Sequence, residues 1–526
     1  MLTVELIRRG ARYFPERTAV YFENKSLTFN EVDRLSNRFA HALARHGINR
    51  GGRLAILANN SLYTMPVDFA CVKAGAARTP LNARLSMDEH EHMLRDTGAQ
   101  VVIYDAELAE RAEVLAARIA GLTMLGLGSN RCGSNLLVEA LSEPETDPLV
   151  RAEPEDVILT VFTSGTTGRL KAAEHTQASY AAMCNNLSAN LPDIAPDDVM
   201  LHAASLFHAS GCFLLPYWVK GAATAVLAKF EPAEFLNAIR RWRVTSTHLV
   251  PTMLAMLLDQ PDIENVDLSS VRTIVYGASP MPVPVIKRAI ELWGPRFVQY
   301  YGQTEAPIFI TKLGQEDHAG LGASHRLSSC GRPSVDCEIR LVDGEGNDVP
   351  PGEQGEIVLR APFVMKGYLN APDLNASTFI EGGWLRTRDV GRFDEEGYLY
   401  LVDRTSDMII TGGYNVYPRE VEDALLAHPV VLECAVVGAP HEKWVEAVTA
   451  FVVLRTLGVA KGEATDDTAE GAIENELIEF TRERLASYKV PKSIHFIDAI
   501  PKSAVGKVLR RALRDQLSTV LNHEPS

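Results

Sequence analysis

The chain of 526 residues has a formal net charge of −15, with 46% hydrophobic and 23% charged residues. This composition is typical of a globular protein, the length exceeds that of one compact core, and the negative charge argues against a nucleic-acid partner. No uncharged apolar run of about 18 residues predicts a membrane span, and the N-terminus lacks the apolar core of a secretory signal. We therefore expect at least two structural units and no membrane span.

The first third of the chain alternates strand-like and helix-like stretches. The strand-like run at 53–60 precedes a helical pattern that ends near Cys71, and the run at 99–105 precedes another helical pattern. Alternation of this kind predicts layered α/β structure around a largely parallel sheet.

From about residue 334 the character changes to short β-like runs separated by Gly/Pro turns, and helical patterns return after residue 403. The predicted fold class is therefore α/β. A large N-terminal domain (1–403) contains layered α/β subdomains and a β-rich part at about 334–403. A small, mobile α+β domain follows at 404–526.

The stretch TVFTSGTTGRLKA at 160–172 combines five hydroxyl side chains, two glycines and Lys171. Glycines allow backbone N–H groups to approach an anion, and hydroxyls and a lysine add further donors. The stretch therefore favours a phosphate-binding loop, although a solvated turn has the same composition.

Three later stretches also combine residues suited to chemistry. VQYYGQTEAP (298–307) contains two aromatics, a glycine, a hydroxyl and a carboxylate; Asp389 stands fifteen residues before Arg404; and Lys507 lies in PKSAVGKVLRR. Taken singly, each could be a core aromatic, a turn acid or a surface lysine. The segment from Thr481 to Asp515 carries nine Lys/Arg and three acids, which fits either a solvated helical face or a docking surface for an anion.

Other functional motifs fail. The loop glycines and Lys171 do not have Walker A spacing, GLGSNR at 126–131 lacks the third glycine of a dinucleotide loop, and two H-E sequences lack the second histidine of a zinc motif. The seven scattered cysteines include no C-x-x-C pair, which predicts reduced thiols in a cytoplasmic protein.

Taken in this order, the four stretches resemble the acyl-adenylate-forming superfamily, which includes acyl-CoA synthetases, adenylation domains of peptide synthetases and luciferases. The resemblance runs from about Phe14 to Arg511. RLSSCGRPS and DMIITGGYNVYPREVEDAL are most similar to bacterial acyl-CoA synthetases that act on fatty or aromatic acids.

The resemblance implies an ATP- and Mg²⁺-dependent carboxylic acid–CoA ligase for fatty or other apolar acids. A carboxylate is a poor electrophile, so it first attacks the α-phosphate of ATP and releases pyrophosphate. The CoA thiol then displaces AMP from the acyl-AMP. Such an enzyme needs positioning and charge neutralisation rather than a nucleophile of its own.

The resemblance also implies the residues of an ATP site. The loop from Thr163 to Lys171 would bind the β- and γ-phosphates, and Tyr301 and residues 277–279 would flank the adenine. The implied ATP- and AMP-binding residues are Thr163, Ser164, Gly165, Thr166, Thr167, Gly168, Lys171, Gly277, Ala278, Ser279, Tyr300, Tyr301, Gly302, Gln303, Thr304, Asp389, Arg404 and Lys507.

The residues implied to be catalytic are Thr163, Glu305, Lys507 and His208, and further residues are implied to contact the nucleotide. Glu305 with Thr163 would hold Mg²⁺, a hard ion suited to oxygen ligands. Lys507 would bridge the carboxylate and the α-phosphate as a mobile point charge. His208 would stand at the mouth of the acyl pocket, with a core histidine as the alternative. Thr304 would reach the α-phosphate, and Asp389 and Arg404 the ribose hydroxyls.

By the same resemblance, the C-terminal domain swings about a hinge near Ser406 between the two half-reactions. Gly412, Gly413 and Tyr414 would then form part of the pantetheine tunnel. The implied CoA contacts are completed by Trp444, Lys489 and Lys492.

The sequence departs from the family pattern at four positions: Leu170 and Ala172 replace proline and glycine, Arg388 replaces glycine, and Ser406 replaces Asp or Lys. Alternatives stay open: a ligase for an aromatic acid or one that loads a carrier protein, a luciferase-like oxidase, and a non-catalytic nucleotide-binding module. The acid, its chain length and the oligomeric state, with a homodimer as one option, also stay open.

Overall fold

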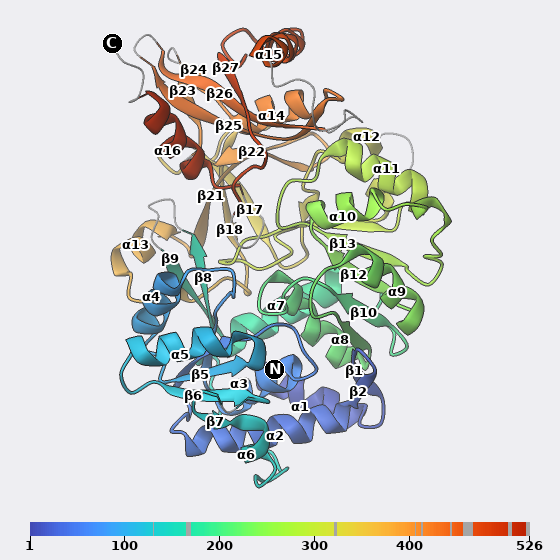
Figure 1. Cartoon of the computed structure of the whole chain (residues 1–526), viewed down its shortest axis with the longest axis vertical. Coiled ribbons are helices and arrows are strands. Elements are labelled where there is room, and N and C mark those ends of the chain that lie inside the picture. Colours follow the sequence, from blue (N-terminus) through green and yellow to red (C-terminus); the bar gives the residue numbers. More distant parts are fainter. Residues whose placement is uncertain are drawn as a thin grey trace. The chain divides into compact units, whose positions relative to one another are not determined.

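The computed structural model describes residues 1–129, 131–164, 170–319, 323–404, 407–411, 414–441, 444–455, 467–502 and 508–521. The chain forms two compact units (Figure 1). The large unit comprises Met1–Pro280, Lys287–Ile339 and Leu359–Arg386, and the small unit comprises Met281–Ile286, Arg340–Val358 and Thr387–Ser526. The predicted domain boundary near residue 403 stays a prediction.

The first sheet of the large unit has eight strands in the order β19-β9-β8-β4-β3-β5-β6-β7. Its central strands are parallel, and β8 with β9 and β9 with β19 are antiparallel. The bounds are β3 (Arg53–Leu57), β4 (Ala77–Pro80), β5 (Val101–Asp105), β6 (Thr123–Leu127), β7 (Ser134–Asn135), β8 (Val157–Ser164), β9 (Leu170–Thr176) and β19 (Gly367–Tyr368).

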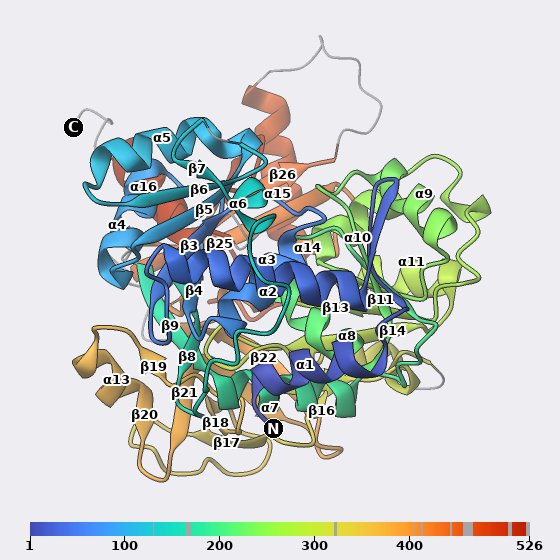
Figure 2. The ribbon, with the colours of Figure 1, turned by 90° about the horizontal axis from the view of Figure 1, so that it is seen from below.

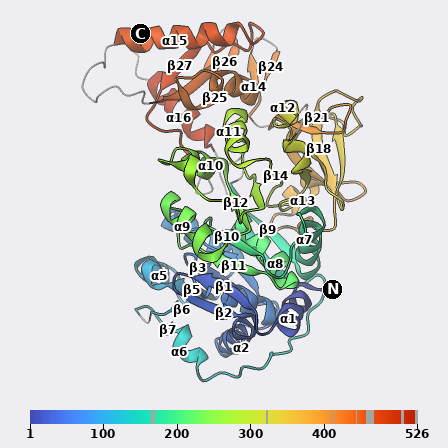
Figure 3. The same cartoon turned by 90° about the vertical axis from the view of Figure 1, so that its right-hand side faces the viewer.

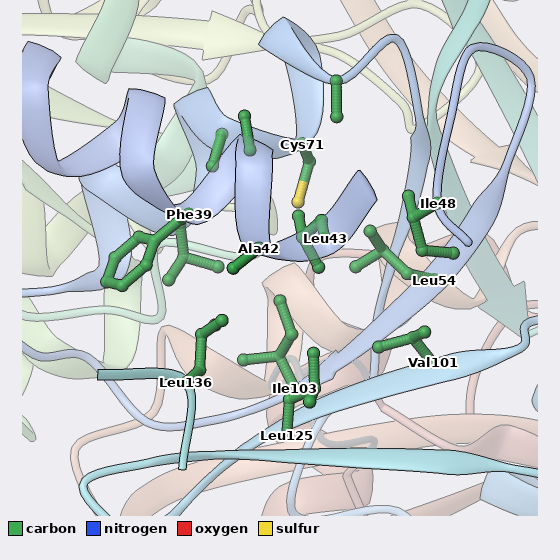
Figure 4. Close-up of a cluster of buried hydrophobic side chains, with 14 of the residues drawn as sticks. Phe39, Ala42, Leu43, Ile48, Leu54, Cys71, Val101, Ile103, Leu125 and Leu136 are labelled. Atoms are coloured by element: carbon green, nitrogen blue, oxygen red, sulfur yellow. The ribbon is translucent and has the colours of Figure 1, made fainter. Parts of the chain in front are cut away.

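Helices cover both faces of this sheet because side chains of a strand alternate between faces. Leu54, Val101 and Ile103 pack with apolar residues of three helices on one face (Figure 4), where α2 and α3 run side by side (Figure 2). Ala55 and Val102 pack with two helices on the other face. The helices are α2 (Phe29–Arg45), α3 (Thr64–Lys73) and α6 (Leu136–Ala140) on the first face, and α4 (Met87–Thr97) and α5 (Ala109–Arg118) on the second.

The second sheet of the large unit has nine strands in the order β16-β15-β14-β13-β12-β10-β11-β1-β2, parallel from β14 to β1. Its strands are β1 (Thr18–Phe22), β2 (Lys25–Thr28), β10 (Val199–His202), β11 (Ala223–Val226), β12 (Ser246–Leu249), β13 (Thr273–Tyr276), β14 (Phe297–Tyr301), β15 (Thr311–Leu313) and β16 (Arg332–Pro333). The neighbouring helices in the chain are α1 (Thr3–Tyr13), α7 (Gln177–Asn190), α8 (Leu214–Lys220), α9 (Pro232–Trp242), α10 (Pro251–Leu258), α11 (Val283–Trp293) and α12 (Ala323–Arg326).

A third, five-stranded sheet has the order β17-β18-β21-β20, with β22 paired to β21. These strands form the β-rich region that the sequence predicts. They are β17 (Glu338–Val342), β18 (Gly355–Arg360), β20 (Phe379–Ile380), β21 (Trp384–Phe393) and β22 (Leu399–Arg404), with α13 (Pro372–Thr378) between β19 and β20 in the chain.

The small unit ends in an α+β fold. Its sheet has the order β24-β23-β26-β25, with β27 paired to β26, and helices pack on both faces (Figure 3). The bounds are β23 (Ile409–Thr411), β24 (Tyr414–Val416), α14 (Pro418–Leu426), β25 (Val431–His441), β26 (Val445–Leu454), α15 (Asp467–Arg482), β27 (Ser493–Phe496) and α16 (Arg510–Leu521). The predicted α/β class with a separate C-terminal α+β part is confirmed. Among the described residues, no helix has the length and apolar character needed to cross a membrane.

Candidate active site

The predicted phosphate loop connects two antiparallel strands of the first sheet. Thr163 at the end of β8 pairs with Lys171 near the start of β9, so strand pairing fixes the two ends of the loop. Gly165, Thr166, Thr167 and Gly168 lie outside the described residues. The departures at Leu170 and Ala172 fall on β9, where Leu170 packs against the apolar cluster and Ala172 is buried. These two positions therefore serve the strand as well as the loop.

The stretch after Tyr301 forms a tight turn. The backbones of Gln303 and Ala306 exchange two hydrogen bonds, of 3.0 and 3.2 Å, which leaves Thr304 and Glu305 at the tip. A Cβ on Gly302 would collide with the backbone of Ile308. Ile308 itself has φ +67°, a left-handed conformation that a β-branched residue rarely adopts. The backbone at Ile308, just after the turn, is thus strained and is held by its surroundings.

Two hydrogen bonds fix the backbone at this tip. The Nε2–H of His175, on β9, donates to the carbonyl oxygen of Thr304 at 2.8 Å. The N–H of Met365 donates to the carbonyl oxygen of Glu305, also at 2.8 Å. Burial lowers the pKa of His175 to about 4, so the imidazole is neutral near pH 7 and its single N–H is the donor.

The Glu305 side chain is held by the strand that pairs with β9. The hydroxyl of Tyr368 donates to Glu305 Oε1 at 2.5 Å. The Nζ of Lys171 lies 5.7 Å from the centroid of the Tyr368 ring. The structure thus brings together Lys171, at the end of the predicted phosphate loop, and Glu305, a predicted metal ligand.

The donor set here suits a magnesium ion. The described residues contain no group of three or more His, Cys, Asp or Glu side chains that would hold a metal by themselves. The carboxylate of Glu305 and the hydroxyl of Thr163 are hard oxygen donors, and Mg²⁺ takes one or two such protein ligands together with phosphate oxygens. These residues therefore fit a Mg²⁺ ion that arrives with a nucleotide.

The two segments predicted to flank the adenine are neighbours in the second sheet. Tyr276 at the end of β13 pairs with Gln299 of β14. A Cβ on Gly277 would lie 2.5 Å from the carbonyl oxygen of Tyr300, and Ala278 has φ +68°. The close approach of the two backbones therefore requires glycine at position 277.

Tyr300 and Tyr301 follow each other on β14, so their side chains point to opposite faces. The hydroxyl of Tyr300 lies 2.9 Å from His248 Nε2, and its ring packs near Phe213. Tyr300 is 3% and Tyr301 8% exposed. The structure therefore places Tyr300 in a buried aromatic cluster.

His208 lies immediately before a short 3-10 helix (Ala209–Phe213). Its Nε2 accepts from Asn82 Nδ2 at 2.9 Å, and the Asn82 amide is oriented because its Oδ1 accepts from the Arg84 N–H at 3.0 Å. Burial, assisted by the positive charge of Arg84, lowers the pKa of His208 to about 4. His208 therefore presents a neutral imidazole with its Nε2 engaged.

Three side chains at this site were missed by the sequence analysis. Asn82 orients His208, His175 fixes the Thr304 carbonyl, and Tyr368 holds Glu305. His175 stands in the strand-like stretch EHT (174–176), directly after the predicted phosphate loop. This position was a signal that could have identified it. Asn82 and Tyr368 lie about 126 and 63 residues from their partners, so no local pattern connects them.

In the small unit, the predicted ribose-binding residues occupy paired positions. Asp389 on β21 lies opposite Arg404 on β22, and Asp389 is buried. Arg388 has φ +64°, a conformation that favours glycine. The left-handed angle explains why glycine is usual at this position. An arginine there strains the backbone.

The predicted CoA contacts are only partly brought together. The Nζ of Lys492 lies 5.8 Å from the centroid of one Trp444 ring, and burial lowers the pKa of Lys492. Lys489 instead forms an ion pair with Glu420 at 2.6 Å. Tyr414 lies on β24 opposite Thr411. Gly412, Gly413, Ser406 and Lys507 lie outside the described residues.

Comparisons with known proteins cover almost the whole chain. A family model described as AMP-binding enzyme matches residues 7–369, and one described as AMP-binding enzyme C-terminal domain matches residues 420–507. A medium/long-chain-fatty-acid–CoA ligase of Mycobacterium tuberculosis is 39% identical over 92% of this chain and 84% of its own length. A feruloyl-CoA synthase of an Amycolatopsis species is 39% identical over 96% and 97%.

A solved structure is also similar to the chain over nearly its whole length. An o-succinylbenzoate CoA synthetase from Bacillus subtilis, in complex with its acyl-adenylate intermediate, superposes with a TM-score of 0.82 at 31% identity and covers 98% of each chain.

Proposed function

The chain belongs to the AMP-binding enzyme family and is an AMP-forming acid–thiol ligase, and we propose that it acts on a fatty acid or another apolar carboxylic acid. It joins the acid to coenzyme A in two steps. The carboxylate attacks the α-phosphorus of ATP and releases pyrophosphate, and the CoA thiol then attacks the acyl carbon of acyl-AMP and releases AMP. The first step needs a site that orients a polyanion and neutralises its charge.

The observation that carries the proposal is the connection between the phosphate-loop hairpin and the Thr304–Glu305 tip. Tyr368 contacts both Lys171 and Glu305, and His175 fixes the adjacent Thr304 carbonyl. In the proposed site, Lys171 and the loop bind the β- and γ-phosphates, Thr304 contacts the α-phosphate, and Glu305 with Thr163 holds Mg²⁺. When bound, Mg²⁺ neutralises charge on the phosphate oxygens.

Nucleoside binding is proposed for the neighbouring strand ends. Tyr301 and the backbone of residues 277–279 flank the adenine. A flat purine fits between the face of an aromatic ring and the closely approaching backbone at Gly277. Asp389 and Arg404, opposite each other on β21 and β22, bind the ribose hydroxyls. Lys507 neutralises the charge that develops between the carboxylate and the α-phosphate.

The acyl group is proposed to enter beside His208. The neutral His208 imidazole adds no charge near the acid, which suits an apolar acid. A second candidate is an aromatic acid, because the feruloyl-CoA synthase is as similar to the chain as the fatty-acid ligase.

Coenzyme A is proposed to bind the small unit through Gly412, Gly413 and Tyr414 and through Trp444 and Lys492. The contact between Lys492 and Trp444 supports a site with an aromatic face and a cation. Lys489 is proposed to contact coenzyme A as well, once its ion pair with Glu420 has broken. A cytoplasmic location is proposed because all seven cysteines are free thiols.

A substrate panel tests the proposal. The purified protein is incubated with ATP, Mg²⁺ and decanoate, palmitate, benzoate or ferulate, with and without CoA, and both pyrophosphate and thioester are measured. Thioester with decanoate or palmitate supports the apolar-acid proposal, and thioester with ferulate alone supports the second candidate. Pyrophosphate release with acyl-AMP retained despite CoA would identify a carrier protein as the acceptor, and no pyrophosphate with any acid would refute the substrate proposal.

A further inference from the structure

We propose that Tyr368 is a positioning residue of the ATP site, whose hydroxyl orients the Glu305 carboxylate for the metal ion and whose ring holds Lys171 ready for phosphate. The inference rests on the proposed function, because it takes Glu305 as the metal ligand. It assigns to Tyr368 a role that neither the loop nor the turn reveals by itself.

The hydroxyl contact is short and directional. At 2.5 Å, the bond from Tyr368 Oη to Glu305 Oε1 has the length of a hydrogen bond between a hydroxyl and an ionised carboxylate. Such a bond fixes one oxygen of the carboxylate, while the other oxygen stays available to a cation. Partners of this kind, which orient a metal ligand without touching the metal, commonly govern affinity.

The backbone around Tyr368 holds the phenol in place. Tyr368 pairs with Ala173 across β19 and β9, and the next residue donates to the Ala172 carbonyl at 2.8 Å. Asn375 bonds both the N–H and the carbonyl of Tyr368, at 2.7 and 2.8 Å. Because Tyr368 is only 9% exposed, its side chain is fixed before any nucleotide binds.

The Tyr368 ring contacts Lys171, the second residue that Tyr368 positions. Lys171 Nζ, 5.7 Å from the ring centroid, is within the range of a cation–π contact. This contact is weaker than an ion pair, so a phosphate oxygen can replace the ring without a large penalty. One tyrosine therefore orders both a metal ligand and a phosphate-binding lysine.

Metal binding separates this role from a purely structural one. Tyr368→Phe keeps the ring and removes the hydroxyl. We expect the Kd of Mn²⁺, measured by electron paramagnetic resonance with a non-hydrolysable ATP analogue, to rise about 10- to 100-fold. The KM for the acid and the unfolding midpoint should stay near the wild-type values. Tyr400→Phe is the matched control, because Tyr400 also donates to a carboxylate, Asp394, at 3.1 Å.

Two further variants complete the test. Tyr368→Leu should show the same metal defect and also raise the KM for ATP about two- to five-fold, because the ring contact with Lys171 is lost. Glu305→Gln should weaken Mn²⁺ binding by itself, and adding Tyr368→Phe to it should change the Kd no further.

The outcomes separate the inference from the proposed function. If Glu305→Gln leaves the Mn²⁺ affinity unchanged, Glu305 is not the metal ligand, and both the assignment and the inference fall. If Glu305→Gln weakens binding but Tyr368→Phe does not, or if the two changes add independently, only the inference falls. A Tyr368→Phe protein that loses stability with normal Mn²⁺ affinity also overturns it.

Discussion

The large and small units hold their proposed ligand-binding residues in different ways. In the large unit, Thr304 and Glu305 are fixed by backbone hydrogen bonds, a neutral buried histidine and a short phenol contact. In the small unit, Lys489 is held by an ion pair with a Glu420 side chain that is 41% exposed. Because Glu420 is in contact with solvent, this partly exposed ion pair is screened and contributes modest stability. Substitutions in the large unit should therefore disturb geometry, whereas those in the small unit should mainly change charge.

The largest expected effect is on Lys507, the residue proposed to neutralise the charge that develops during acyl-AMP formation. Lys507→Ala should slow acyl-AMP formation by about 10²- to 10³-fold, because a charge that stabilises the developing transition state is removed. Thioester formation from supplied acyl-AMP should stay largely intact. Rapid-quench measurements of the two half-reactions check both statements.

Lys502→Ala is the matched control for this variant. Lys502 lies in the same segment but forms an ion pair with Glu433 at 2.6 Å. We expect its loss to leave both half-reactions unchanged. Equal losses of both half-reactions in Lys507→Ala would contradict the assigned role.

The next effect is geometric and belongs to the large unit. Gly277→Val would force a Cβ to within 2.5 Å of the Tyr300 carbonyl oxygen, so the two strand ends must separate. We expect a loss of about 3 kcal/mol in the free energy of unfolding and weaker AMP binding. Urea unfolding and calorimetry measure these quantities. Gly344→Val is the control, because no atom lies within 4 Å of its added Cβ; equal losses in both would remove the steric explanation.

The fold was largely predictable because hydrophobic periodicity is local. The strand-like runs at 53–60 and 99–105 became β3 and β5, and the helical patterns after them became α3 and α5. The β-rich region and the terminal α+β fold were also predicted from short runs and turns. The pairing of β19 with β9 was not, since these strands lie about 190 residues apart and only the tertiary fold brings them together.

Candidate site residues could be identified from the sequence where they are consecutive, and their roles stay predictions. The phosphate-loop hairpin and the turn at 302–306 are each one stretch, so their residue types point to them. Asn82, His175 and Tyr368 act on partners in other segments, so no local pattern connects them to those partners. The backbone angle at Arg388 likewise follows from the turn around it and is invisible in the residue type.

A smaller effect follows from the neutral histidine of the large unit. His175 has a pKa of about 4 when folded, against 6.5 ordinarily, so the unfolded chain binds more protons between these values. Its contribution is therefore complete above pH 6.5 and is lost as the pH falls towards 4. Between pH 7 and pH 5 we expect His175 to account for about 2 kcal/mol of lost stability. We measure the free energy of unfolding in urea at pH 7 and at pH 5. Over this interval His175→Gln should lose about 2 kcal/mol less stability than the wild-type protein; identical losses would contradict the prediction.

The smallest effect tests the strained backbone of the small unit. Arg388→Gly should raise the free energy of unfolding by up to about 1 kcal/mol, because a residue with a Cβ pays about 1–2 kcal/mol for φ +64° and glycine's greater freedom in the unfolded chain offsets part of the gain. The backbone N–H of residue 388 keeps its bond to Glu356 Oε1, at 3.3 Å, so the β21 geometry beside Asp389 should be retained. Lys25→Gly, at an exposed strand position without a left-handed φ, should instead lower stability by about 0.5–1 kcal/mol. Opposite signs in the two urea-unfolding experiments support backbone strain at Arg388, whereas a loss of stability in both would show that the Arg388 side chain contributes more than its conformation costs.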